Sequence, residues 1–211
     1  MRCEVNGHRK WIKQSEYVAH LGNHKDFEEK MSVVTDQYEY LQARLIFLTD
    51  GAKWISNWIN AQYPQATQIL DFYHAKEHLG HFAASYFRDK QQTNQWIERL
   101  AEQLLEQGLQ QAMKSMAGLP KSKKNIENQR QNLISYYNNN AYRMNYPQYL
   151  ARNYCIGSGA IEAAHRSVSQ QRLKLSGQRW TQAGAQHVLN LRVLRLSNRW
   201  AELQNLMKNA A

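Results

Sequence analysis

The sequence has few of the residues that mark fibrous, disordered or disulfide-stabilised chains. Its 211 residues include 3 prolines, 10 glycines and 2 cysteines, Cys3 and Cys155. So little proline and glycine excludes a collagen-like or low-complexity chain. Two isolated cysteines are too few for a disulfide framework or a zinc ribbon. No stretch reaches the roughly 20 apolar residues of a transmembrane helix, and the first residues lack an apolar signal-peptide core. We therefore expect a soluble cytoplasmic protein without a membrane partner.

Acidic residues are scarce toward the end of the chain. The formal net charge is +10, and it divides into −1 for residues 1–78, +4 for 79–150 and +7 for 151–211. No Asp or Glu occurs between Glu162 and Glu202. Because charge of one sign repels itself, such a stretch favours a polyanionic partner, and nucleic acid is the commonest one. The candidate DNA-binding residues in this interval are Arg166, Arg172, Lys174, Arg179, Arg192, Arg195 and Arg199.

Residues 1–78 have the character of alternating strands and helices. We expect strands at 2–5, 16–20, 43–49 and 67–73. The run at 43–49 is almost continuously apolar, which is typical of a strand buried on both faces. A helix with Trp54 and Trp58 on one side follows it and ends near Pro64. Strand, helix and strand within about thirty residues predict a βαβ unit in an α/β or α+β fold.

From His74 onward the apolar residues recur at helical spacing. We expect helices at about 92–116, 125–139, 160–175 and 181–206. The segment 79–150 therefore has the pattern of an all-helical insertion. In the last helix, the predicted buried stripe consists of Leu189, Val193, Leu196 and Trp200, and the adjoining face carries Arg192, Arg195 and Arg199.

Three carboxylates lie at positions where chemistry is possible. Asp50 ends a predicted strand and is followed by Gly51, so it would stand at the carboxyl edge of a sheet, where α/β proteins bind ligands. It could equally be an ordinary turn residue. Asp71 also ends a strand, or it caps the following helix. Glu162 lies early in a helix, where it could instead complement the helix dipole or pair with Arg166.

Histidines are concentrated just after the second strand of the βαβ unit. His74, His78 and His81 have helical spacing, and with Asp71 they could form a zinc site. No cysteine lies nearby. Hydrogen-bonded structural histidines are therefore the favoured interpretation.

Several motifs together resemble the transposases of the Kra-type insertion sequences, which are bacterial relatives of the Mutator-like DDE transposases. They occur in the family's order and at roughly its spacing, and they cover nearly the whole chain. The matching segments are 17–22, 48–55, 68–79, 139–146, 156–162, 171–180 and the Gly-Ala-Gln at 184–186.

The resemblance implies a ribonuclease H-like mixed sheet that a helical insertion interrupts before the last catalytic residue. Residues 1–78 would be the N-terminal part of the catalytic domain, 79–150 the insertion, and 151–211 the catalytic helix with basic DNA-contacting helices. Asp50 would be the second catalytic aspartate and Glu162 the triad glutamate, both ligands of Mg²⁺ or Mn²⁺. Asp71 and His74 would form an accessory element that positions the site or the DNA.

Two divalent ions held by three carboxylates can activate an attacking water or 3′-hydroxyl and stabilise the leaving oxygen. The implied reaction is DNA transposition by metal-dependent strand cleavage and transfer, with transposon ends and target DNA as partners. A homo-oligomer would suit that reaction, and no small-molecule substrate is implied.

The first aspartate of the family's triad has no counterpart here. The only aspartates before Asp50 are Asp26 and Asp36, and neither follows a predicted buried strand. We expect that the first strand and its aspartate are missing, which makes the chain inactive alone. Two alternatives remain open. A partner polypeptide could complete an active site, or the chain could be a non-catalytic nucleic-acid-binding module that uses only its basic helices.

Overall fold

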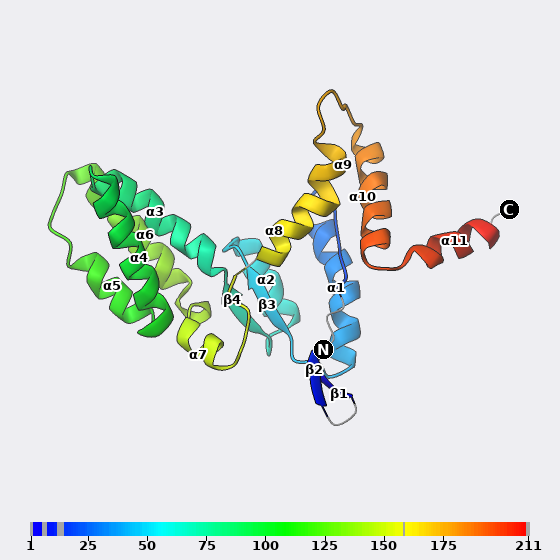
Figure 1. The fold of residues 1–211 in the computed structure, drawn as a ribbon, viewed down its shortest axis with the longest axis horizontal. Coiled ribbons are helices and arrows are strands. Elements are labelled where there is room, and N and C mark those ends of the chain that lie inside the picture. The colour runs from blue at the N-terminus through cyan, green and yellow to red at the C-terminus, as the bar shows by residue number, and fades with distance from the viewer. Residues whose placement is uncertain (1, 6–7, 12–14, 158, 210–211) are drawn as a thin grey trace. The chain divides into compact units, whose positions relative to one another are not determined.

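The computed structural model describes residues 2–5, 8–11, 15–157 and 159–209 (Figure 1). The chain divides into two compact units, residues 1–38 with 159–211, and residues 39–158. Helices make up most of each unit. The predicted segments 1–78, 79–150 and 151–211 are defined by the role expected of each one, whereas the two units are defined by contacts. The expected roles stay a prediction.

The βαβ unit predicted from the sequence is present in the 39–158 unit. It consists of β3 (Ile46–Thr49), α2 (Lys53–Gln62) and β4 (Thr67–Leu70). The two strands are parallel, with Ile46 opposite Thr67 and Thr49 opposite Leu70. The second strand is shorter than the predicted 67–73, because Asp71 turns the chain into a helix that begins at Phe72.

The sequence predicts that β3 is buried on both faces, and this prediction is wrong. Ile46 is 39% exposed and the other three residues are half-buried. In the described part of the chain, β3 pairs only with β4. A strand with one neighbour has less apolar surface covered than a strand in the middle of a layered sheet.

The outer edge of β4 is covered by tyrosine hydroxyls. The hydroxyl of Tyr149 donates to the carbonyl oxygen of Gln68, and that of Tyr146 donates to the carbonyl oxygen of Leu70, each at 3.2 Å. Residues two apart in a strand point their carbonyls to the same side, so both bonds satisfy the edge that faces away from β3. Both tyrosines belong to α7 (Tyr146–Ala151).

The rest of this unit is helical, as expected for 79–150. The predicted helix at 92–116 is two helices, because Gly108 adopts φ +83°, a value that breaks the helix and suits glycine. The predicted helix at 125–139 is confirmed as α6. Besides α7, the helices are α3 (Phe72–Tyr86), α4 (Lys90–Glu106), α5 (Leu109–Ala117), α6 (Lys124–Asn139) and the 3₁₀ turn η1 (Ala141–Arg143).

The hydrophobic core joins β4 to these helices. Asp71 and Asp89 begin α3 and α4 by accepting backbone hydrogen bonds from His74 and Gln92, both at 2.8 Å. The helices then pack side by side (Figure 1). Fully buried core residues include Ile69, Leu70, Ala75, Leu79, Leu100, Leu104, Met116, Tyr137, Met144 and Tyr146.

The second unit combines the first and last parts of the chain. Its elements are the antiparallel strands β1 (Arg2–Val5) and β2 (His8–Trp11), then α1 (His24–Tyr40), α8 (Gly159–His165), the π-helix η2 (Arg166–Gln170), α9 (Gln171–Leu173), α10 (Gln182–Leu196) and α11 (Trp200–Asn209). The end of α1 crosses into the other unit.

Two predicted helices of this unit are interrupted. The helix at 160–175 contains the π-helical turn, and the helix at 181–206 stops at Leu196 and restarts at Trp200. Asn198, with φ +58°, lies in this break. The predicted stripe is therefore only partly buried: Leu189 is 5% exposed, whereas Trp200 is 38% exposed.

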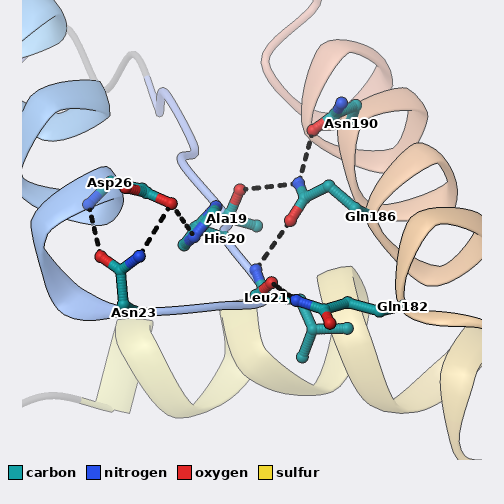
Figure 2. Close-up of polar contacts among 8 residues, drawn as sticks. All are labelled: Ala19, His20, Leu21, Asn23, Asp26, Gln182, Gln186 and Asn190. Atoms are coloured by element: carbon teal, nitrogen blue, oxygen red, sulfur yellow. Dashed lines mark hydrogen bonds and ion pairs between the residues drawn. The ribbon is translucent and has the colours of Figure 1, made fainter.

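The predicted strand at 16–20 is extended but pairs with no strand among the described residues. The Tyr17 amide donates to the Ser197 hydroxyl at 3.0 Å instead. Glutamine side chains of α10 bind the backbone of Ala19 and of the next residue but one, Leu21 (Figure 2). Gln186 accepts from the Leu21 amide at 2.7 Å and donates to the Ala19 carbonyl at 3.3 Å, and Gln182 donates to the Leu21 carbonyl at 3.2 Å. Side-chain amides carry a donor and an acceptor and can therefore replace a neighbouring strand.

The described residues are mostly helical, with one small parallel sheet and one antiparallel hairpin among them. This agrees with the mixed α and β class but does not establish a ribonuclease H-like sheet. In the described part of the chain, no helix combines the length and apolarity needed to cross a membrane.

Candidate functional site

Asp50 lies where the sequence placed it, directly after β3. Its side chain is exposed, and its Oδ1 accepts a hydrogen bond from the amide of Ala52 at 3.0 Å. That bond is the turn interaction considered as an alternative role. Gly51 has φ +101°, which favours glycine and sharpens the turn. One carboxylate oxygen thus fixes the loop while the residue remains open to solvent.

Asp71 directly follows β4, as Asp50 directly follows β3, and the two aspartates therefore lie at the same edge of the sheet. Thr49 and Leu70 are register partners, and the amide of Asp71 donates to the Thr49 carbonyl at 2.8 Å. In contrast to Asp50, Asp71 is only 2% exposed, and its Oδ1 caps α3. The predicted capping role is therefore present, and two aspartates mark the carboxyl edge of the parallel sheet.

The sequence analysis missed Tyr136, which reaches this edge from α6. Its hydroxyl is buried and has no hydrogen-bond partner among the described residues. The ring stacks on His78 with centroids 3.9 Å apart. Burial raises the pKa of Tyr136 to about 12, opposed by Arg143 and supported by the negative charges of Asp50 and Asp71.

A buried arginine binds the last residue of β3 at the same edge. Arg143 is 2% exposed, and its Nη1 donates to the Thr49 hydroxyl at 3.1 Å. Its Nε and Nη2 both donate to Asn140 Oδ1, at 3.0 and 2.6 Å. No carboxylate of the described residues lies within ion-pair distance of it. The guanidinium fixes the last residue of β3, next to Asp50.

The three histidines lie along α3, and two of them, His78 and His81, line an open cavity of about 280 Å³. The His74 and His78 rings meet edge to face at 5.0 Å, and His74 Nδ1 lies 3.5 Å from Glu77. Burial, and then the charges of His74 and His81, lower the pKa of His78, which favours the neutral imidazole. The cavity is lined by His78, His81, Phe82, Gln129, Asn132, Leu133 and Tyr136.

The histidines do not form the zinc site considered from the sequence. No group of three or more His, Cys, Asp or Glu side chains among the described residues is arranged to hold a metal ion. Their interpretation as structural histidines stays a prediction.

Glu162 belongs to the other compact unit. It lies in the first turn of α8 and is exposed. No ion pair joins it to Arg166 among the described residues, so the pairing considered from the sequence is not formed. The π-helix that follows is a rare element, and single π turns occur frequently at functional sites.

The candidate DNA-binding residues fall into two groups. Arg192 donates through Nη2 to the Ser167 carbonyl and fixes the π-helix to α10. Arg199 pairs with Glu16 at 3.1 Å and Glu202 at 2.8 Å. In the described part of the chain, the others are exposed and make no ion pair: Arg166, Arg172, Lys174, Arg179 and Arg195.

The described chain is thus mostly helical, with two aspartates at the carboxyl edge of a parallel βαβ unit and with a basic helical segment. The family described as Uncharacterised protein family (UPF0236) matches residues 2–205, and the chain belongs to that family. No curated protein and no solved structure matches it.

Proposed function

We propose that the chain is part of an insertion-sequence transposase of the DDE type, which moves DNA by metal-dependent strand cleavage and transfer. The observation that carries the proposal is the pair Asp50 and Asp71 at the carboxyl edge of adjacent parallel strands, with Asp50 exposed. Ligands of open α/β sheets bind at this edge. A ribonuclease H-like catalytic domain and a cytoplasmic location belong to the same proposal.

The carboxylates have the right chemistry for Mg²⁺ or Mn²⁺ but are too few. Oxygen ligands suit these ions, and Asp50 and Glu162 are both exposed. However, no cluster of three candidate ligands exists among the described residues. We therefore assign no catalytic step to these residues alone. A third carboxylate from another polypeptide segment would have to complete the site.

The basic segment supports DNA as the partner. Five exposed cations lie between residues 166 and 195 without an acidic residue among them. Each phosphate that such a cation neutralises releases counterions, so affinity should fall steeply with salt. Asp71 and His74 are proposed to support the site structurally, since Asp71 is buried and caps the helix that carries His74.

The proposal is tested by a magnesium-dependent nicking and strand-transfer assay on a labelled terminal DNA fragment, with Asp50→Asn and Glu162→Gln as controls. We expect salt-sensitive binding without cleavage by the 211 residues alone. When a polypeptide carrying the third carboxylate is added, both variants should abolish cleavage and keep the DNA affinity of the parent chain. A cleavage rate that survives Glu162→Gln would refute the triad assignment.

The absence of a metal-binding cluster in the described residues favours one second candidate, a non-catalytic nucleic-acid-binding module. It predicts that Asp50→Ala and Glu162→Ala leave every DNA-dependent property unchanged, whereas Arg195→Ala weakens binding. Cleavage that is restored by a complementing polypeptide and lost in Asp50→Asn would exclude it.

A further inference from the structure

An open pocket of about 390 Å³ lies within the unit formed by residues 1–38 and 159–211. Its walls come from α9, α10 and the first residue of α11. It is lined by Arg172, Val188, Leu191, Arg192, Arg195 and Trp200. Three of these six residues are arginines, and no carboxylate of the described residues is among them. The pocket therefore has the charge to attract an anion.

Two of the three guanidinium groups are available to a ligand. Arg172 and Arg195 are exposed and form no ion pair in the described part of the chain. Arg192 is half-buried and donates to the Ser167 carbonyl and, at 3.4 Å, to Gln171 Oε1. It thus fixes the wall that carries Arg172. Planar guanidinium groups match phosphate oxygens in geometry and charge.

The same pocket has an aromatic and aliphatic side. Trp200 is 38% exposed and Leu191 is 42% exposed, although both are large apolar side chains. The break after α10 places Trp200 here rather than on the buried stripe that the sequence predicted. An exposed indole beside free arginines can stack a flat ring while the arginines hold its phosphate.

We propose that this pocket binds one nucleotide unit of an unpaired DNA strand, with the phosphate at Arg172 and Arg195 and the base on Trp200. The proposal rests on the proposed function for the choice of DNA. In a duplex the faces of the bases are stacked on one another and cannot reach an indole. Only an unpaired strand offers both groups that the pocket is built to hold.

The experiment compares the affinities of the full chain for a labelled single strand and for the matching duplex by fluorescence anisotropy. Trp200→Ala is expected to weaken single-strand binding about tenfold and to change duplex binding less than about twofold, because stacking contributes only to the unpaired strand. Trp200→Phe keeps an aromatic face and should retain most of the affinity. Trp180→Ala, an exposed tryptophan that does not line the pocket, serves as the matched control.

Arg195→Gln should weaken binding of the single strand and reduce its dependence on salt, because it removes one phosphate contact. Deoxyadenosine monophosphate is titrated as a competitor to separate a strand from a free nucleotide. We expect it to displace the strand only in large excess. Competition by the mononucleotide at the concentration of the strand would overturn the assignment to DNA.

These experiments distinguish a failure of the proposed function from a failure of the pocket proposal. If neither single strand nor duplex binds, the proposed function fails. If DNA binds but Trp200→Ala behaves as Trp180→Ala does, the pocket proposal alone fails. Equal loss with Trp200→Phe and Trp200→Ala would also overturn it, because a phenyl ring can still stack.

Discussion

The hydroxyl of Tyr136 occupies the space that a side chain at Gly51 would need. A Cβ atom built on Gly51 would lie 2.7 Å from Tyr136 Oη and 3.3 Å from Leu70 Cδ1. Tyr136 is on α6, in the segment predicted to be a helical insertion, whereas Gly51 follows Asp50. The segment predicted to be an insertion therefore packs directly against the turn that holds Asp50.

Gly51→Ala should destabilise the 39–158 unit through two effects. The positive φ strains any residue with a Cβ, at a cost of about 1–3 kcal/mol. The added methyl group also collides with the Tyr136 hydroxyl. We expect the cost to shrink when Gly51→Ala is made in a Tyr136→Phe background. Urea unfolding of the four proteins measures this coupling.

Gly108→Ala is the matched control for that cycle. Gly108 also has positive φ, but nothing lies within 4 Å of its Cβ position. Its cost should be the same with Tyr136 or Phe at position 136. If Gly51→Ala were also unaffected by the Tyr136→Phe change, the contact between these residues would be energetically irrelevant.

Arg143→Lys should be strongly destabilising although it conserves the charge. Arg143 places three nitrogens on two acceptors, Thr49 Oγ1 and Asn140 Oδ1, and one ammonium group cannot reproduce that fork. Loss of these buried charged hydrogen bonds should cost about 2–4 kcal/mol. The exposed Arg99→Lys on α4 should change the free energy of unfolding by less than about 0.5 kcal/mol. Equal effects would contradict the role of Arg143.

Acid should destabilise the fold partly through His78. The pKa of His78 is lowered in the folded state. Below about pH 6.5 the imidazole therefore binds a proton more readily in the unfolded chain than in the folded chain. The contribution is fully present above that pH and is lost as the pH falls toward the folded-state pKa. His74, His81, Glu77 and Tyr136 surround the ring.

The measurement is the urea midpoint of the parent chain and of His78→Gln at about pH 7.5 and 5.5. The variant should lose less stability between these two pH values. His187→Gln, an exposed histidine on α10, should lose as much as the parent. A variant at position 78 with the parent's full pH dependence would contradict this account.

The sequence predicted the parts of the fold that depend on local patterns. The βαβ unit around Asp50 and the helix at 125–139 follow from apolar periodicity and turn residues, and both are present. The break at Gly108 was missed because apolar spacing continues across it, although a glycine was its only local signal. Trp200 was misplaced for the same reason.

Interactions between distant residues could not be read from the sequence. The strand predicted at 16–20 has the right residues, but Gln186 (Figure 2) and Ser197, more than 160 positions away, bind its backbone. Tyr136 and Arg143 reach the end of β3 only through the packing of α6 and η1. The sequence could therefore name Asp50 and Asp71, but not the side chains that surround them.

The most direct test of the central claim, that the basic segment holds DNA, is the salt dependence of duplex affinity. We predict a steep loss of affinity with rising salt, and Arg179→Gln should reduce the logarithmic slope by about one. Arg199→Gln should leave the slope close to that of the parent, because Glu16 and Glu202 already bind this guanidinium. An affinity that does not change with salt, or equal effects of the two variants, would contradict the account.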